Sequence, residues 1–391
     1  MKISKRNCPI CECKISEKLF DVRINIEKTL GLPSEYDVVC CEYCGFCFAD
    51  TEATHEDYEN YYKNSNYYGE IPREKEEYQY LFQLVKEQLE NTIEKDAYLL
   101  DIGFGKGELD VYLFNNGYKN ICGIDPSEES VRHLNQSGII ANVGSVYDCP
   151  EKSIENKYKV VFMFNIFEHL YSPYLAIEQI KRYLDQNGFL YLWLPIFDDL
   201  KDDTTQIVNN FNQEHINYFS QTSLKNLMEL NGFVEIHSKQ AIAAKLGQSK
   251  TYGLLAIYQY DVYKNSIKIN RDINTKKSIL DYYGRVNQKT IKTIGKIKKL
   301  LNNNKKIVIW GTGAFVMNLL AITDLKYCNI DYFVDNNPLK IGKEFQGKNI
   351  ESPEKLRIFE GTIVVCAMLY SHDIEKQIID MKLNNEVIIL E

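Results

Sequence analysis

The chain lacks the long hydrophobic runs that a membrane span requires. Its longest apolar stretches have the length of strands, well short of the roughly 20 residues that cross a bilayer as a helix. The basic start, MKISKRNCPICECK, is followed by no apolar core of the kind that a secretory signal peptide carries. We therefore expect a cytoplasmic protein that makes no contact with a membrane.

An excess of positive charge is also missing. The formal net charge is −8 at pH 7, whereas a general nucleic-acid surface normally presents net positive charge. A nucleic-acid partner is therefore not expected. The length of 391 residues and the hydrophobic content of 45% are sufficient for the cores of two or three domains.

Cysteine is too scarce for a disulfide scaffold, with eleven in the whole chain. Near the N-terminus the cysteines cluster, which in a reducing compartment favours metal binding. Cys8 and Cys11 form one C-x-x-C motif, and Cys41 and Cys44 form another after a gap of 29 residues. Four thiolates at this spacing are typical of a closed tetrahedral zinc site that holds a domain together and does no chemistry.

Three further cysteines, Cys13, Cys40 and Cys47, are surplus to this site, and we interpret them as packing residues. Cys40 could replace Cys41 in a site shifted by one residue. A polar stretch at 55–70 then carries five tyrosines, which could stack on a sugar or a base or simply pack the metal domain on its neighbour: Tyr58, Tyr61, Tyr62, Tyr67 and Tyr68.

The segment LLDIGFGKGE at 99–108 is the most informative part of the chain. It places Asp101 two positions before Gly103, Gly105 and Gly107, at the end of an expected buried strand. A dinucleotide-binding loop reads Gly-x-Gly-x-x-Gly and directs a helix N-terminus at a pyrophosphate. Here the glycines are evenly spaced, and Asp101 would repel a phosphate. The ligand is therefore expected to carry a positive charge.

In this arrangement the chain resembles the class I methyltransferases that use S-adenosylmethionine (SAM). The resemblance places Asp101 near the ammonium group of SAM. The segment NICGIDPS at 120–127 reads as a second strand that ends in Asp125, which is well placed to accept hydrogen bonds from both ribose hydroxyls. The other cofactor contacts that it implies are Gly103, Phe104, Gly105, Gly107, Pro126, Ser145, Asn165 and His169.

Apolar periodicity divides the chain into four parts. We expect a zinc-binding and tyrosine-rich domain at 1–70 and a doubly wound α/β methyltransferase domain at 71–262. Its elements include a helix at 74–94, a buried strand at 159–170, a helix and strand leading to 195, and a closing antiparallel hairpin. A helical linker at 263–304 and a Rossmann-like α/β domain at 305–391 complete the chain.

The linker is basic and amphipathic. Residues 264–306 contain 13 lysines and arginines against only Asp272 and Asp281. The positive face could attract a diphosphate or simply be solvated. A 3–4 spacing predicts the buried side of this helix, namely Ile279, Tyr283, Val286, Thr290, Ile294, Ile297 and Leu301.

The last segment begins like a dinucleotide site, with Gly311 and Gly313 in a turn and Asp335 at a second strand end. Val316 stands at the third glycine position, which argues against NAD. The pattern V-D-N-N-P-x-K-x-G-K resembles small nucleotide-binding-like domains that accompany sugar-modifying enzymes. We therefore favour a platform for the substrate or a nucleotide-sugar over a redox site.

The order of these parts resembles the bacterial sugar C-methyltransferases that act on nucleotide-linked keto-deoxysugars. The motifs that carry the resemblance are the four cysteines, DIGFGKG, FEHLYSP at 167–173 and FNQEHINYFS at 211–220. It implies a dTDP-, GDP- or UDP-linked sugar substrate in deoxysugar biosynthesis, and a monomer or small homo-oligomer. It also implies that Glu214 and His215 lie beside the sugar.

Carbon is a poor nucleophile until it loses a proton, and a 4-keto group acidifies the neighbouring C–H bond. A neutral histidine is a suitable base at cellular pH, so we predict His215 as the base and Glu214 as its orienting partner. Tyr67, Tyr68 or a lysine would stabilise the enolate oxygen. The other pair, Glu168 and His169, is expected on the cofactor side, although His169 could supply the base instead.

Two departures from the family concern the acceptor. LGQSKTYG at 246–253 stands where a histidine-glycine-glycine-serine turn is usual, so only Gly247 and Ser249 match it. CAMLYSHD at 366–373 lacks a proline-tryptophan-asparagine turn. O- or N-methylation of a sugar, for surface polysaccharide or antibiotic biosynthesis, and a zinc-ribbon RNA methyltransferase therefore remain as alternatives. So do a nicotinamide-dependent oxidoreductase and an inactive SAM-binding scaffold.

Overall fold

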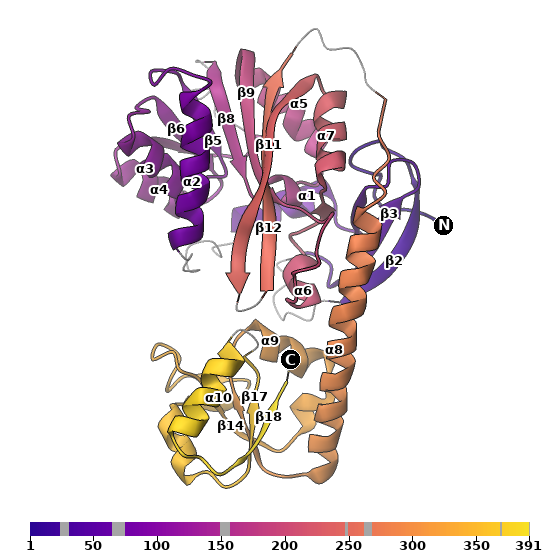
Figure 1. Ribbon diagram of the computed structural model, residues 1–391, viewed down its shortest axis with the longest axis vertical. Helices are drawn as coiled ribbons and strands as arrows, with labels where there is room; N and C mark the ends of the chain where they lie inside the picture. The colour runs from indigo at the N-terminus through magenta and orange to yellow at the C-terminus, as the bar shows by residue number, and fades with distance from the viewer. Residues whose placement is uncertain are drawn as a thin grey trace.

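The computed structural model describes residues 1–23, 31–64, 75–148, 157–246, 249–261, 268–367 and 370–390. It forms three sheets arranged as Figure 1 shows, with the N-terminal sheet beside the central one and the C-terminal domain at the other end of a long helix, α8 (Thr275–Asn303). The expected fold class is confirmed. Two of the expected boundaries, 70/71 and 262/263, fall outside the described residues.

The N-terminal sheet is antiparallel and has the strand order β1-β2-β3-β4-β10. Its first four strands are β1 (Lys2–Ile3), β2 (Ile15–Arg23), β3 (Glu35–Cys41) and β4 (Cys47–Asp50), and helix α1 (His55–Asn64) follows them. The fifth strand, β10 (Asn217–Tyr218), comes from much later in the chain and pairs with β4. The N-terminal sheet is therefore completed by a strand from the central region of the chain and not by N-terminal residues alone.

The central sheet has seven strands in the order β11-β12-β9-β8-β5-β6-β7. Five strands are parallel: β5 (Leu99–Ile102), β6 (Ile121–Asp125), β7 (Ile140–Val143), β8 (Tyr158–Phe164) and β9 (Leu184–Pro195). The expected antiparallel hairpin is present as β11 (Phe233–Leu246) and β12 (Ser249–Tyr260). The strand order reverses between β5 and β8, which is where doubly wound sheets bind ligands.

Helices cover both faces of this sheet. One face packs against α2 (Lys75–Glu90), α3 (Glu108–Asn115) and α4 (Glu128–Gln136), and the other packs against α5 (Pro173–Tyr183) and α7 (Gln221–Leu230). The strand expected at 159–170 ends at Phe164, because Phe167–His169 form a 3₁₀ turn, η3. The short helix α6 (Ile207–Asn210) precedes β10.

The C-terminal domain is a six-stranded sheet in the order β15-β16-β14-β13-β17-β18. Its strands are β13 (Ile307–Trp310), β14 (Ile330–Val334), β15 (Glu344–Phe345), β16 (Lys348–Glu351), β17 (Thr362–Val365) and β18 (Glu386–Ile389). Its helices are α9 (Ala314–Ile322) and α10 (Ser371–Asp380), with two 3₁₀ turns, η4 (Asp324–Tyr327) and η5 (Pro353–Ile358).

Helix α8 joins two cores, as Figure 1 shows along its length. Ile279, Tyr282 and Val286 pack into the core of the N-terminal region, whereas Ile297 and Leu300 pack into the C-terminal domain. The expected buried side of the helix is partly wrong. Tyr283, Thr290, Ile294 and Leu301 are only half-buried, because the buried positions lie one residue earlier, at Tyr282, Thr293 and Leu300.

Among the helices that the structure describes, none is long and apolar enough to cross a membrane.

Asp272 links the start of α8 to both neighbouring regions. Its backbone amide donates to the Cys44 carbonyl at 2.8 Å, and a Cβ atom at Gly45 would lie 2.0 Å from its carbonyl oxygen. The buried carboxylate accepts hydrogen bonds from the Ser220 hydroxyl, from the Asn274 amide at 3.0 Å and from the Thr275 hydroxyl at 2.7 Å. Through its backbone and its side chain, one residue thus holds the N-terminal region, α7 and α8 together.

We predict that Asp272→Ala lowers the free energy of unfolding by about 2–4 kcal/mol, because it leaves several buried donors without an acceptor. Urea denaturation measures this change. Asp281→Ala is the matched control, since Asp281 pairs with Lys277 on the exposed side of α8, and we expect a change within about 0.5 kcal/mol. Equal losses in the two variants would contradict this account of the junction.

Candidate functional site

A cavity of about 290 Å³ opens at the carboxyl ends of β5, β6 and β8. Of the expected cofactor residues, Gly107 does not line it, because it caps the N-terminus of α3. The others do line it, namely Asp101, Gly103, Phe104, Gly105, Asp125, Pro126, Ser145, Asn165 and His169. The structure therefore brings these residues together at one cavity, and the role of each stays a prediction.

The glycine loop needs its glycines for two reasons. Gly103, Gly105 and Gly107 have φ angles of 75°, 59° and 67°, a region that residues with a Cβ rarely adopt. In addition, a Cβ at Gly103 would lie 2.3 Å from the Ile166 side chain. The loop can therefore turn sharply and present its backbone to the cavity.

Asp125 fixes this loop to the next strand. Its Oδ2 accepts a hydrogen bond from the Gly105 amide at 2.8 Å, and its Oδ1 accepts one from the Ser127 amide at 2.9 Å. Ser127 also caps α4 as expected, since its hydroxyl accepts from the Ser130 amide. Burial raises the pKa of Asp125 to about 6, although the two amides oppose the shift. Each carboxylate oxygen has lone pairs left for a ligand.

Three buried carboxyl groups lie close together at this end of the sheet: Asp101 and Asp125 line the cavity, and Asp110 lies beside Asp101. Burial and the neighbouring Asp110 carboxyl raise the pKa of Asp101 well above its usual range. Burial also raises the pKa of Asp110 to about 7. Apart from each other, Asp101 Oδ1 and the Asp110 oxygens have no hydrogen-bond partner within the described parts of the chain. A cationic ligand group would compensate these buried carboxyls.

Asp110 is a residue that sequence reasoning missed. It stands on α3 among Leu109, Val111 and Leu113 and is fully buried. The signal available was an acid on the apolar side of a short helix, three residues after the glycine loop. Helix α1 also contributes lining residues that were not singled out as cavity residues, namely Glu59, Tyr62 and Lys63.

His169 forms part of the cavity wall, in the 3₁₀ turn after β8. Its Nδ1 lies 3.1 Å from the Glu214 carbonyl oxygen. Because a carbonyl can only accept, Nδ1 carries the proton and Nε2 keeps a free lone pair. Burial lowers the pKa of His169 to about 4. The ring is therefore neutral at cellular pH.

His215 lies behind His169, with the two rings 4.9 Å apart between centroids. It does not line the cavity itself. Burial and the neighbouring His169 lower the pKa of His215 to about 3. Its buried Nδ1 has no hydrogen-bond partner among the described residues, while the backbone of Asn210 bonds to the ring. The Glu214 carboxylate accepts a hydrogen bond from the Tyr61 hydroxyl.

Glu168 completes this group. Its carboxyl is 1% exposed, and burial raises its pKa to about 8. One oxygen lies 3.7 Å from His169 Nε2. Glu168, His169 and His215 offer ligand atoms within 4.8 Å of one another, so the group has the residue types for proton transfer or for a metal ion.

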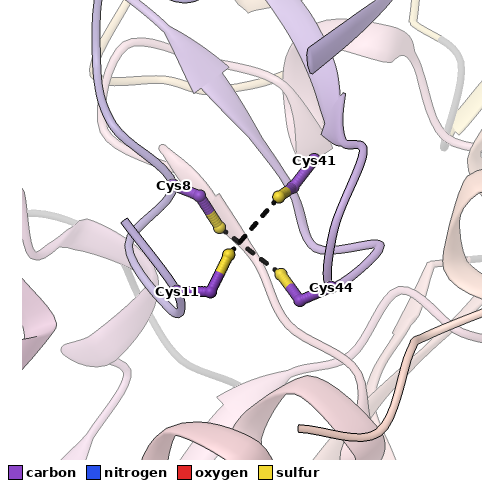
Figure 2. Close-up of side chains that lie close together, drawn as sticks. All are labelled: Cys8, Cys11, Cys41 and Cys44. Atoms are coloured by element: carbon purple, nitrogen blue, oxygen red, sulfur yellow. Dashed lines mark hydrogen bonds between the residues drawn. The ribbon is translucent and has the colours of Figure 1, made fainter. Parts of the chain in front are cut away.

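The four cysteines of the two motifs form a second cluster, shown in Figure 2. The Sγ atoms of Cys8 and Cys44 are 3.5 Å apart, as are those of Cys11 and Cys41, and all four lie within 4.8 Å of one another. Tetrahedral thiolates at the usual zinc distance are about 3.8 Å apart. The cluster therefore fits a metal ion.

The shifted alternative, with Cys40 in place of Cys41, is wrong. Cys40 lies on the opposite face of β3, because neighbouring residues of a strand alternate. It pairs with Cys47 across the sheet, and its thiol contacts the Gly45 carbonyl at 3.4 Å. Cys40 and Cys47 are buried, as packing residues should be.

Some expected acceptor residues cannot be placed. Tyr67, Tyr68 and Gly247 lie outside the described residues. Ser249 is buried, and its hydroxyl accepts from the Thr204 amide and contacts Asp203. In the C-terminal domain, Asp335 is engaged by Thr312 and by Lys340 at 3.1 Å.

Comparisons with known proteins agree with this geometry. Residues 73–238 match the family described as a methyltransferase domain, and residues 303–389 match the family described as C2185-like, N-terminal. Curated relatives include a tRNA U34 carboxymethyltransferase of Vibrio cholerae, 29% identical over 170 residues that cover 40% of this chain and 51% of the relative. The same enzyme of Aeromonas hydrophila is 27% identical over 150 residues, or 36% of this chain and 45% of the relative. The chain thus spans about half the length of these relatives.

Solved structures that resemble part of this chain include a SAM-dependent methyltransferase of Anabaena variabilis, with a TM-score of 0.43 and 13% identity, covering 54% of this chain and 96% of that one. Another, from Mesorhizobium loti, has a TM-score of 0.36 and 10% identity, covering 44% and 96%. The family match coincides with the sheet that carries the glycine loop and Asp125. The chain therefore contains a SAM-dependent methyltransferase domain.

Proposed function

We propose that the protein transfers the methyl group of SAM to a nucleotide-linked keto-deoxysugar, with carbon as the methylated atom. The observation that carries this proposal is the pair of buried, neutral histidines, His169 and His215, beside the cofactor cavity. SAM supplies an electrophilic methyl group that an aligned nucleophile displaces. A carbon nucleophile additionally requires a base, which a neutral imidazole can provide.

Residues of the cavity divide naturally between the two ends of SAM. We assign Asp125 to the ribose hydroxyls and Asp101, with Asp110 behind it, to the ammonium group. Asn165, held with a φ of 55° after β8, also lines the cavity, and we assign it to the methionine end of SAM. This arrangement would orient the methyl group toward the side on which His169 stands.

We assign the acceptor side to both Glu-His pairs, Glu214 with His215 and Glu168 with His169. His215 remains our candidate base, with Glu214 as its orienting partner. His169 lines the cavity directly and is the alternative, in which case His215 would receive the proton from it. Tyr67 and Tyr68 stay predicted contacts of the enolate oxygen.

The curated relatives suggest a second function, transfer of a carboxymethyl group to tRNA. Such a donor carries an additional carboxylate, and the cavity is lined by the acids Asp101, Asp125 and Glu59 as well as by Lys63 and Lys106. The net charge of −8 opposes binding of RNA. We therefore favour the sugar. O- or N-methylation of the same class of substrate would use the same cavity without a carbon acid.

We further propose that the four-cysteine cluster holds a structural zinc ion and that the C-terminal domain is a platform for the nucleotide-sugar. Four thiolates leave no open position on zinc for chemistry. The role of the metal is then to fix the loops at 8–11 and 41–44.

Metal analysis should find about one zinc ion per chain. Cys41→Ser should remove it and unfold the N-terminal sheet, because the ligand set is broken. Cys40→Ser is a stringent control, since Cys40 is the adjacent residue but lies on the other face of β3, and it should retain the metal. Retention of zinc by Cys41→Ser, or its loss only in Cys40→Ser, would refute the assignment.

Asp125→Ala should weaken SAM binding about 10- to 100-fold, because the ribose hydroxyls lose a charged acceptor. The pH dependence tests the same contact. Since the pKa of Asp125 is about 6, its carboxylate is present above that pH and protonated below it. Binding of methylthioadenosine, which has the ribose but no ammonium group, should weaken as the pH falls through 6.

Isothermal titration across pH measures this effect. Asp125→Asn should flatten the profile, and Asp148→Asn, an exposed acid at the cavity rim, should leave it unchanged. A profile that is the same in wild type and Asp125→Asn would show that Asp125 does not contact the ribose.

The substrate class is tested by incubation with SAM and a panel of dTDP-, GDP- and UDP-linked 4-keto-6-deoxysugars. We expect one methyl group to be added, and solvent deuterium to enter the acceptor in the absence of SAM. His215→Ala should reduce both about 10²–10⁴-fold while it retains SAM binding. His237→Ala, on β11, is the control.

If only His169→Ala loses methyl transfer and deuterium exchange, the general base is His169 and not His215. Methyl transfer without deuterium exchange would indicate a hydroxyl or amine as the acceptor. The sugar proposal fails if none of the panel is methylated while tRNA is.

A further inference from the structure

Arg6 belongs to the metal-binding region but reaches deep into the methyltransferase domain. The residue is 3% exposed. Its Nη1 donates to the Ile216 carbonyl at 3.2 Å, and its Nη2 donates to the carbonyls of Leu170 at 3.2 Å and Tyr171 at 2.5 Å. Nη2 also donates to Asn217 Oδ1 at 3.0 Å. One guanidinium thus joins two segments that are more than 40 residues apart in sequence.

These two segments are the ones that carry the histidines. Leu170 directly follows His169, and Ile216 directly follows His215. Asn217 reinforces the link, since its Nδ2 donates to the carbonyls of Phe167 at 2.9 Å and Leu170 at 2.7 Å. Arg6 therefore sets the distance between the two backbones from which the imidazole rings project.

The four-cysteine cluster fixes Arg6 in turn. Arg6 lies two residues before Cys8, and the Cys8 amide donates to the Cys13 carbonyl at 3.0 Å within the same loop. The Arg6 amide donates to the buried carboxylate of Asp50 at 3.0 Å, which also pairs with Lys2 at 2.7 Å. A metal ion held by Cys8 would therefore restrict the position of Arg6, because only two peptide bonds separate the two residues and Asp50 holds the Arg6 amide.

Burial of the charged Arg6 guanidinium costs free energy. Its partners are carbonyls, one amide oxygen and the rings of Tyr171 and Phe48, whose centroids lie 4.8 and 5.9 Å from its Cζ atom. Among the described residues no ion pair with a carboxylate is recorded for its guanidinium, and burial lowers the pKa of Arg6. An apolar side chain would fill this space at lower desolvation cost. Only the planar fork of arginine can reach both segments at once.

We propose that Arg6 is a positioning residue through which the metal-binding region holds His169 and His215 in their relative orientation. The proposal rests on the function proposed above only in assigning these histidines to catalysis. The positioning itself does not depend on which acceptor is methylated, and it is tested without one.

The chain has six histidines, so the ring signals of ¹³C-labelled histidine can be assigned by single substitutions in the sinefungin complex. Arg6→Ala should shift the signals of His169 and His215 and leave those of His133, His237 and His372 in place, whereas His55 is not diagnostic because its ring contacts Tyr171, a partner of Arg6. Arg271→Ala is the matched control: Arg271 also donates to carbonyls of the metal-binding region, those of Glu42 and Tyr43, but it contacts neither histidine segment. It should leave all six signals unchanged.

Rescue separates positioning from a general loss of stability. Added guanidinium should restore the two signals in Arg6→Ala, and Arg6→Lys should give intermediate shifts, because an ammonium reaches fewer of the carbonyls. If Arg6→Ala does not fold, Asn217→Ser, which removes the amide bridge between the same segments, should produce the same selective shift. With an accepted substrate, turnover should fall about 10- to 100-fold.

The proposal is overturned if a folded, zinc-loaded Arg6→Ala retains the wild-type signals of both histidines, or if Arg271→Ala shifts them equally. Absence of methyl transfer to any sugar would count against the proposed function alone, since the histidine signals are measured with sinefungin only.

Discussion

The structure depends on the pairing of β10 with β4. The two residues of β10 follow directly after Glu214, His215 and Ile216, and their pairing with β4 makes them the fifth strand of the N-terminal sheet. The metal-binding region is therefore continuous, by backbone hydrogen bonds, with the segment that carries the second Glu-His pair. The four-cysteine cluster, distant in sequence from the second Glu-His pair, is thereby tied to the segment that carries this pair.

A second constraint is the surplus of buried negative charge below the glycine loop. Asp101, Asp110 and Asp125 lie close together in a region without a recorded ion pair to any of them among the described residues. Burial of unpaired carboxyls costs free energy, and part of this cost is avoided by raised pKa values. A ligand with an ammonium and a sulfonium group would offset part of the remainder, which is consistent with a cluster of acids below the glycine loop.

The sequence predicted this part well because the determinants are local. The glycine spacing, the acid two residues before it and the acid at the next strand end each follow from a few adjacent residues, and all of these residues except Gly107 line the cavity. The four cysteines were equally predictable, although the choice between Cys40 and Cys41 required the alternation of side chains along β3 to be known.

Other features were not predictable because they depend on tertiary packing. Nothing local to Asn217 indicates that it extends the N-terminal sheet, and Arg6 reads as an ordinary basic residue near a chain terminus. Asp110 was missed because an isolated acid on a helix is usually solvated. The buried side of α8 was misplaced by one residue at Tyr283, Ile294 and Leu301, since two different cores select which side of each turn is covered.

The central claim is that the cavity after β5 holds a positively charged adenosine derivative. A crystal structure of the complex with sinefungin tests it most directly. The account predicts the ribose of sinefungin within hydrogen-bond distance of Asp125 and its terminal amine beside Asp101, with the transferred-group end toward His169. An empty cavity under saturating sinefungin, or a phosphorylated coenzyme bound there in its place, would contradict the account.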